Sequence, residues 1–139
     1  HPDMIIHLGD CWADAEQLHR KFPMTVMEQV PGNCDCRQEV QERILLIEGK
    51  KILICHGHTF NVKAGYLNLE YAAEERKVDA ALFGHTHRVF YDKHNRIAYM
   101  NPGSIGQPPY GIPPSYGVLQ VDGSSNTIAT DVIYLEENN

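Results

Sequence analysis

The sequence has no long apolar run, and this absence narrows the class of protein. No stretch approaches the length that crosses a bilayer, so we expect a soluble protein with no membrane partner. Basic residues are also few, because 12 Lys and Arg stand against 18 Asp and Glu and the formal net charge is −6. A groove that neutralises phosphates needs the opposite balance, so general binding to nucleic acid is not expected.

Cysteine is scarce as well and shows no organised spacing. The four cysteines fit neither a zinc ribbon nor a disulfide framework: Cys11, Cys34, Cys36 and Cys55. Reduced thiols in the cytoplasm are the simplest interpretation. The 139 residues, 42 % hydrophobic and 22 % charged, predict one globular domain over residues 1–139.

The first part of the chain alternates strands and helices. Apolar and β-branched runs predict strands over 4–8, 25–30, 42–48, 50–55 and 78–83, the third and fourth joined by a tight turn at Glu48-Gly49. Helical spacing of apolar residues predicts helices over 11–22 and 62–77, each with one face directed to the core. This alternation predicts an α/β fold.

The second part predicts further strands over 89–91, 97–100, 116–121 and 127–134, which we expect to form an antiparallel sheet. Two sheets packed face to face with helices outside follow from this order. The Gly- and Pro-rich segment 101–116 between them predicts a rim that shapes substrate entry. Its Pro113 to Tyr116 string matches a short proline motif, but Tyr116 begins a strand, so docking through it is discounted.

Polar residues follow four of the predicted strands at their carboxyl ends, where open α/β sheets hold ligands. They are Asp10, Asn33, His56, and His85 with His87. Gly84 is expected to let the chain turn in front of the last pair. Mixed oxygen and imidazole groups suit divalent manganese, nickel, cobalt, iron or zinc, and two such ions can clamp a phosphoryl group and an attacking hydroxide.

These motifs carry a family resemblance over essentially the whole chain. Gly9-Asp10, Gly32-Asn33-Cys34-Asp35, His56-Gly57-His58, Gly84-His85-Thr86-His87 and Asn101-Pro102-Gly103-Ser104, in that order, resemble the small bacterial and archaeal phosphodiesterases of the calcineurin-like metallophosphoesterase superfamily. The resemblance implies a four-layer α/β/β/α sandwich and a phosphodiesterase with two divalent ions, manganese being the first choice. It also implies that Asp10 bridges the ions, that Asn33, His56 and His85 complete one site, and that His87 belongs to the other.

Two departures from the family pattern shape the expectations. The family begins with a strand ending in Asp-x-His, and no such motif precedes Met4, so we expect an N-terminally incomplete domain. Such a chain would hold the ion at Asn33, His56 and His85 tightly and the other weakly. The edge around Met4 to Leu8 would then be open to pairing, which allows a homo-oligomer.

The second departure is Cys34, where many members of the wider superfamily have His. A thiol is a poorer proton donor near neutral pH, so substrates with good leaving groups are expected. His58 is a second candidate for acid catalysis or substrate contact, with a solvated loop residue as the alternative. Asn33, Asn101 and Ser104 are the expected substrate-binding residues.

Two other interpretations stay open at this stage. The retromer-subunit branch of the same fold resembles these enzymes yet acts mainly by binding protein partners, and a scaffold of that kind would present an apolar patch. A structural zinc domain fits least well, because such sites prefer four closed ligands rich in cysteine. The natural phosphodiester would be set by loops such as 106–114.

Overall fold

The computed structural model describes residues 2–35 and 40–135, so Cys36 lies outside the described residues. The elements in chain order are β1 (Met4–His7), α1 (Trp12–Lys21), β2 (Val26–Gln29), β3 (Glu42–Ile47), β4 (Lys50–Cys55), a 3-10 turn (His58–Phe60), α2 (Leu67–Glu75), β5 (Ala80–Leu82), β6 (Val89–His94), β7 (Ile97–Pro102), β8 (Ser115–Asp122) and β9 (Thr127–Tyr134). In the described part of the chain, no helix is long and apolar enough to span a bilayer.

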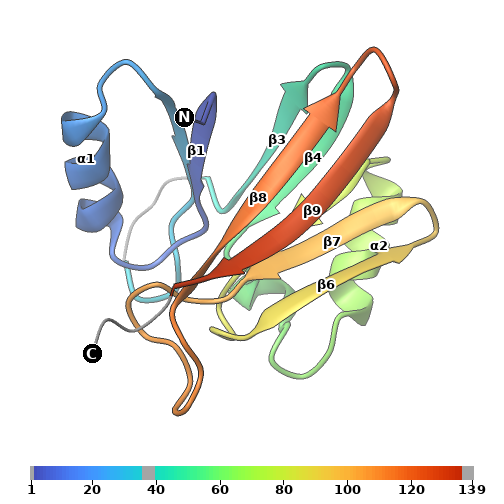
Figure 1. Cartoon of the computed structure of the whole chain (residues 1–139). Coiled ribbons are helices and arrows are strands. Elements are labelled where there is room, and N and C mark those ends of the chain that lie inside the picture. The colour runs from blue at the N-terminus through green and yellow to red at the C-terminus, as the bar shows by residue number, and fades with distance from the viewer. Residues whose placement is uncertain (1, 36–39, 136–139) are drawn as a thin grey trace.

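Three groups of strands build the fold. The largest is a five-stranded sheet in the order β3-β4-β5-β7-β6, in which β4, β5 and β7 run parallel and the two edge strands antiparallel. The parallel pair β1-β2 and the antiparallel pair β8-β9 form the other two groups. The β8-β9 hairpin crosses in front of the five-stranded sheet, while α1 lies beyond β1 and β2 (Figure 1).

Two apolar clusters show how these parts pack. One joins the five-stranded sheet to α2, through Leu53 and Tyr99 on the strands, Phe83 directly after β5, and Leu69 and Ala73 on the helix. The other joins the opposite face of that sheet to the paired strands, with Ile52, Ile54 and Leu82 against side chains of β1, β8 and β9. This mixed α/β fold confirms the predicted class.

Two details of the prediction are wrong. The strands of the second part do not form one antiparallel sheet, because β6 and β7 extend the five-stranded sheet while β8 and β9 pack on its face. The helix predicted over 62–77 is α2 at 67–75 only. Gly65 has φ +151° and Lys77 has φ +54°, conformations that a right-handed helix cannot contain.

The proline motif at 113–116 is partly built into the sheet. Ser115 begins β8, is buried, and donates its hydroxyl to the Pro102 carbonyl at 2.7 Å. The backbone N–H of Leu135 binds the Pro114 carbonyl at 2.8 Å. These contacts support discounting the motif as a docking peptide.

Candidate metal centre

Loops from the five-stranded sheet and from the β1-β2 pair meet at one edge of the fold. The carboxyl ends of β4 and β5 share an edge of the large sheet because these strands are parallel, and β1 and β2 are likewise parallel. Two hydrogen bonds tie these loops together: His56 Nδ1 donates to the Leu8 carbonyl at 2.7 Å, and the Gly84 N–H donates to the His56 carbonyl at 2.8 Å. His56 therefore connects the two layers.

The other ring nitrogen of His56 is the centre of a polar cluster. Its Nε2 lies 3.1 Å from Asn33 Oδ1, 3.1 Å from His85 Nδ1 and 3.4 Å from Asp10 Oδ2. Each neighbour follows a different strand, as the sequence predicts for a shared site. The structure thus brings together four of the five residues expected to bind metal.

The protonation of His56 follows from its contacts. A carbonyl can only accept, so the bond to Leu8 places the proton on Nδ1 and leaves a lone pair on Nε2. Burial lowers the pKa of His56, and burial together with the neighbouring His56 lowers the pKa of His85 to about 4. If His85 Nδ1 carries a proton, it can donate to the lone pair on His56 Nε2. The Asn33 and Asp10 oxygens still face that lone pair with no proton between them.

This convergence of electron pairs fits a cation. Ligand atoms about 2.0–2.2 Å from a divalent ion stand roughly 3.0–3.5 Å from one another, which matches the separations around His56 Nε2. Among the described residues, His, Cys, Asp and Glu side chains alone do not form a group of three arranged to hold an ion. A donor set at this point would therefore have to include the amide oxygen of Asn33.

Asp35 holds the turn that carries Asn33, a role that the sequence interpretation missed. One carboxylate oxygen accepts the Gly32 N–H at 2.7 Å and the other accepts the Trp12 N–H at 3.0 Å. In the same turn, the Cys34 N–H donates to Asp10 Oδ1 at 3.0 Å, while the Cys34 side chain is exposed. Asp35 thus caps α1 from a distant loop and fixes two loops of the cluster.

Two glycines allow these loops to approach. A Cβ at Gly32 would overlap the main-chain nitrogen and carboxylate of Asp10, and one at Gly9 would lie 2.6 Å from His56 Nδ1. Both separations are far shorter than van der Waals contact. The glycines of Gly9-Asp10 and Gly32-Asn33 are therefore required by space at this crossing.

Several residues with strained backbone conformations lie at the same edge. Four residues without the freedom of glycine have left-handed φ values here: Asp10 at 60°, Cys11 at 53°, His85 at 71° and His87 at 61°. The expected role of Gly84 is not seen, because its φ is not left-handed and an added Cβ would meet only ordinary contacts at 3.7 Å. The turn after β5 is made by the two histidines themselves.

His87 and His58 differ from the four clustered residues. No contact among the described residues joins His87 to the cluster, so its part in a second metal site stays a prediction. The His58 ring lies 5.3 Å from that of His56 and 6.1 Å from that of His85. Its Nδ1 is buried without a hydrogen-bond partner among the described residues, which keeps it available to a ligand.

Asn101 and Ser104 make contacts within the protein. Asn101 is fully buried, donates to the Gly84 carbonyl at 3.0 Å and to Thr86 Oγ1 at 2.9 Å, and accepts the Gly103 N–H at 3.0 Å. These bonds give it a clear role in holding the loop after β5. Ser104 Oγ accepts a backbone N–H three residues later. Substrate binding by either residue stays a prediction.

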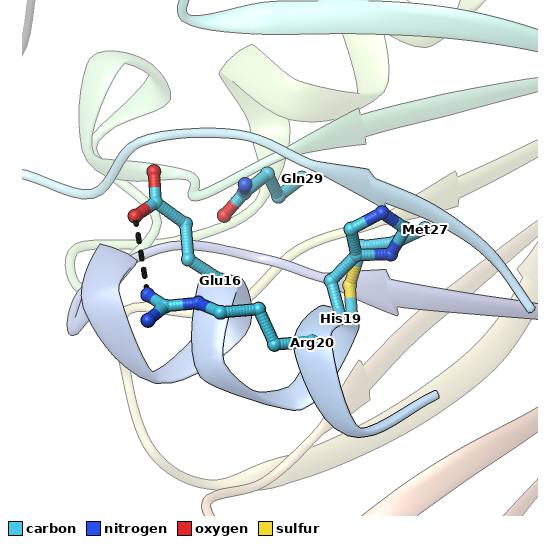
Figure 2. A pocket seen from close by; sticks show the side chains of 5 residues that line it. All are labelled: Glu16, His19, Arg20, Met27 and Gln29. Carbon is cyan, nitrogen blue, oxygen red and sulfur yellow. Dashed lines mark ion pairs between the residues drawn. The ribbon is translucent and has the colours of Figure 1, made fainter. Parts of the chain in front are cut away.

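Two depressions lie near α1. One, of about 310 Å³, lies between α1 and β2 and is lined by Glu16, His19, Arg20, Met27 and Gln29 (Figure 2). It contains none of the expected site residues. The other, of about 500 Å³, includes Asp10 and Cys34 and reaches Gln107 of the long Gly- and Pro-rich loop. The predicted rim segment therefore borders the second depression.

The mixed α/β fold is that of a phosphoesterase domain. Residues 1–124 match the Calcineurin-like phosphoesterase superfamily domain, and the chain belongs to that superfamily. The resemblance found in the motifs is thereby confirmed. The chain is 35 % identical over 128 residues, 91 % of its length, to the probable metallophosphoesterase YsnB of Bacillus subtilis, of which it spans 73 %.

Other relatives extend this picture. The chain is 30 % identical over 114 residues, 82 % of its length, to the phosphodiesterase YfcE of Escherichia coli, and it spans 50 % of that protein. Two crystal structures share the fold: a predicted phosphoesterase from Streptococcus pneumoniae (TM-score 0.77, 22 % identity, 94 % and 88 % of the two chains covered) and Entamoeba histolytica Vps29 with zinc (TM-score 0.74, 19 % identity, 95 % and 82 % covered).

Proposed function

We propose that this protein is a metal-dependent phosphodiesterase. The proposal rests mainly on one observation: the Asn33 and Asp10 oxygens and His85 Nδ1 converge on His56 Nε2. These atoms carry lone pairs, and too few protons lie between them to join them all by hydrogen bonds. Membership of the phosphoesterase superfamily and the name of the Escherichia coli relative support the reaction class.

In this proposal the chain's residues hold and orient two divalent ions. Asn33, His56 and His85 would hold one ion, His87 would contribute to the second, and Asp10 would be shared by the two. Imidazole and oxygen donors without thiolate suit divalent manganese, nickel, cobalt, iron or zinc. Manganese is the first choice only because of the family resemblance. When bound, such ions activate water for attack and neutralise charge that develops on phosphorus.

Other residues at this edge of the fold would orient His56 or contact the substrate. Leu8 fixes the tautomer of His56, a contact of the kind that raises the basicity of a metal ligand. His58 and Cys34 are the candidates for contact with the leaving group, and Asn33 for contact with the phosphoryl oxygens. Because a thiol is a poorer proton donor than an imidazole near neutral pH, contact of the leaving group with Cys34 would favour diesters with good leaving groups.

A protein-binding scaffold is the second candidate, because the fold is shared with Vps29. The fold likeness at 19 % identity carries no activity of its own. The enzyme is favoured because Gly9, Gly32 and Asp35 bring the donor groups together. It is also favoured because relatives that are at least 30 % identical are named metallophosphoesterase and phosphodiesterase.

The test is hydrolysis of bis(4-nitrophenyl) phosphate with manganese, before and after removal of the metal by a chelator. We expect turnover that is abolished by chelation, restored by manganese and lost in His85→Ala. The matched control is His94→Ala, because His94 is exposed at the far end of β6. Absence of turnover with manganese, nickel, cobalt and zinc would contradict the proposal, as would equal turnover in His85→Ala.

A further inference from the structure

A tight turn after β4 carries the chain past the candidate metal centre. The 3-10 turn over His58–Phe60 ends at Asn61, whose left-handed φ of +53° reverses the direction of the chain. The N–H groups of Phe60 and Val62 both donate to the Gly57 carbonyl, at 3.0 and 3.4 Å. The N–H of Asn61 donates to the His58 carbonyl at 3.2 Å. These local bonds fix the course of the chain as far as Val62.

Helix α2 holds this turn from the other side. The guanidinium of Arg76 lies 5.7 Å from the centre of the Phe60 ring, and it also donates to Glu42 Oε1 at 2.7 Å. A cation placed over an aromatic face is attracted to it, so Arg76 and Phe60 stabilise each other. Asn68 Nδ2 approaches the Phe60 carbonyl to 3.5 Å. The turn is therefore tied to α2 and to the sheet beneath it.

Val62 anchors the end of the turn between the two loops that carry histidines. It is 2 % exposed, and a Cβ added at Gly57 would lie 2.9 Å from its Cγ2 and 3.6 Å from Phe83 Cβ. Gly57 directly follows His56, and Phe83 stands two positions before His85. The residue after Val62 is therefore presented beside the cluster.

That residue is Lys63, and it is exposed. Burial, followed by the charges of His56 and Lys63, lowers the pKa of His85 to about 4, so the positive field of Lys63 reaches the cluster. Within residues 2–35 and 40–135, no carboxylate forms an ion pair with Lys63. Its charge is therefore not neutralised by these parts of the protein.

An ammonium in this position opposes a cation and favours an anion. Like charges repel, so Lys63 on its own weakens the binding of a metal ion at His85. A phosphoryl group held at the cluster brings negative oxygens to the same edge of the fold. Lysine suits this partner, because its flexible stem carries a compact charge that donates hydrogen bonds to phosphate oxygens.

We infer from these contacts that Lys63 is a substrate-binding residue that holds a phosphoryl oxygen of the diester beside His85. The inference rests on the proposed function, because the cluster must hold the same phosphoryl group. A contact of this kind is made equally in the ground state and in the transition state, so it acts on binding more than on the chemical step. Because the contact is exposed, salt should screen it.

Binding of inorganic phosphate to the manganese-loaded chain tests the inference without turnover. In a calorimetric titration, we expect Lys63→Gln to weaken phosphate binding about tenfold, as for loss of one hydrogen bond to a charged group. Lys63→Arg keeps the charge and should retain most of the affinity. Manganese affinity should not fall in Lys63→Gln, because this substitution removes a repulsive charge.

Lys93→Gln is the matched control, because Lys93 is exposed near the far end of β6. It should change neither the phosphate nor the manganese affinity. Equal phosphate affinity in the parent chain and in Lys63→Gln would overturn the inference. A parallel loss of manganese affinity in Lys63→Gln would also overturn it, because the residue would then support the turn and not the anion.

Steady-state kinetics gives the second readout. For bis(4-nitrophenyl) phosphate, we expect Lys63→Gln to raise KM about tenfold and to leave kcat nearly unchanged. Added salt should raise KM more in the parent chain than in Lys63→Gln, because only the parent has the charge to be screened. A fall in kcat at constant KM would contradict a role in binding.

The two proposals fail in different ways. Loss of phosphate affinity in Lys63→Gln, in a chain that hydrolyses no diester, would keep Lys63 as an anion-binding residue and refute the phosphodiesterase. Turnover with the same KM in the parent chain and in Lys63→Gln would keep the phosphodiesterase and refute the role of Lys63.

Discussion

The two ends of the packed strands are built by different rules. At the end that carries the cluster, hydrogen bonds join residues 23, 24 and 48 positions apart: Trp12 to Asp35, Cys34 to Asp10 and His56 to Leu8. At the other end, the β8-β9 turn is closed by bonds from residues two and three positions beyond Asp122. The first end depends on the whole fold and the second on local sequence.

The difference has a physical consequence. A local turn needs only residues that accept its backbone conformation, as Glu48 and Gly49 do with φ values of 50° and 79°. The strand-end cluster must bring a carboxylate, an amide and two imidazoles to one point, which requires close backbone approach and strained residues. Substitutions at the cluster should therefore impair function far more than equivalent ones in the turns.

Substitution of Gly32 should have the largest effect on hydrolysis, and Gly49 is the comparison. Gly32→Ala forces a Cβ into the space of Asp10, so we expect at least about a hundredfold loss of manganese-dependent hydrolysis, as for other displacements near 1 Å at a reaction centre. Gly49→Ala has open space but a left-handed φ, so it should cost about 1 kcal/mol of stability and leave turnover intact.

Both variants can be followed by steady-state kinetics and thermal unfolding. The comparison would be broken by a Gly32→Ala variant that turns over substrate as well as the parent chain. It would also be broken by a Gly49→Ala variant that loses activity while remaining folded.

Asp35 offers a second and smaller contrast. Asp35→Asn places an amide donor against the N–H of either Gly32 or Trp12, so the turn that presents Asn33 loosens. Outer partners of metal ligands commonly contribute 10- to 100-fold to metal affinity, so we expect a loss of about that size in manganese binding. The Gly32 and Trp12 amides should also exchange faster with solvent in the metal-free chain.

Asp14→Asn is the matched control, because Asp14 lies in the first turn of α1 and is exposed. It removes the same charge without touching the bonds made by Asp35. If manganese affinity falls equally in both variants, local charge and not the clamp would explain the effect.

The sequence predicts the position of the site well because strand ends can be read locally. Apolar runs mark the strands, and the polar residue after each run marks the edge where Asp10, Asn33, His56 and His85 meet. The roles of Asp35, Gly9 and Gly32 depend on contacts between segments more than 20 positions apart, and no local pattern contains them. An acid two positions after Asn33 was the one available signal.

The division of the later strands was not predictable for a related reason. Alternating apolar residues in β6, β7, β8 and β9 are equally consistent with one sheet or two, and only the contacts with β5 and with the second cluster separate them. The helix prediction failed at Gly65, whose φ of +151° depends on the surrounding turns. Period and composition set element type more firmly than element ends.

Cysteine reactivity should distinguish the buried sheet from the exposed loops. Burial raises the pKa of the Cys55 thiol to about 12, so on the order of one thiol in ten thousand is ionised at pH 8. We expect iodoacetamide to modify Cys55 only after denaturant is added. Cys11 is exposed and should react in the native chain, although burial and the nearby Asp14 and Asp10 also raise its pKa.

Peptide mapping by mass spectrometry identifies which cysteine is modified. Rapid labelling of Cys55 in the native chain would show that β4 opens readily. That result would contradict a rigid sheet beneath His56.

The smallest effect is expected at Asp122. Hydrogen bonds from Ser124 and Ser125 lower the pKa of this exposed carboxyl, so the stability it adds is present above its unfolded pKa and is lost as the pH falls through its lower folded pKa. Asp122→Asn should flatten the acid side of the stability profile slightly and leave manganese-dependent turnover unchanged. A profile identical to that of the parent chain would show that these turn bonds add nothing measurable.

The most direct test of the account is a calorimetric titration of manganese into the metal-free chain, into His85→Ala and into His94→Ala. The account predicts one tight ion per chain, weakened at least about a hundredfold in His85→Ala and unchanged in His94→Ala, because removing a ligand costs more than removing an outer partner. Equal affinity in His85→Ala, or no tight binding to the parent chain, would contradict the claim that the strand-end cluster is a metal centre.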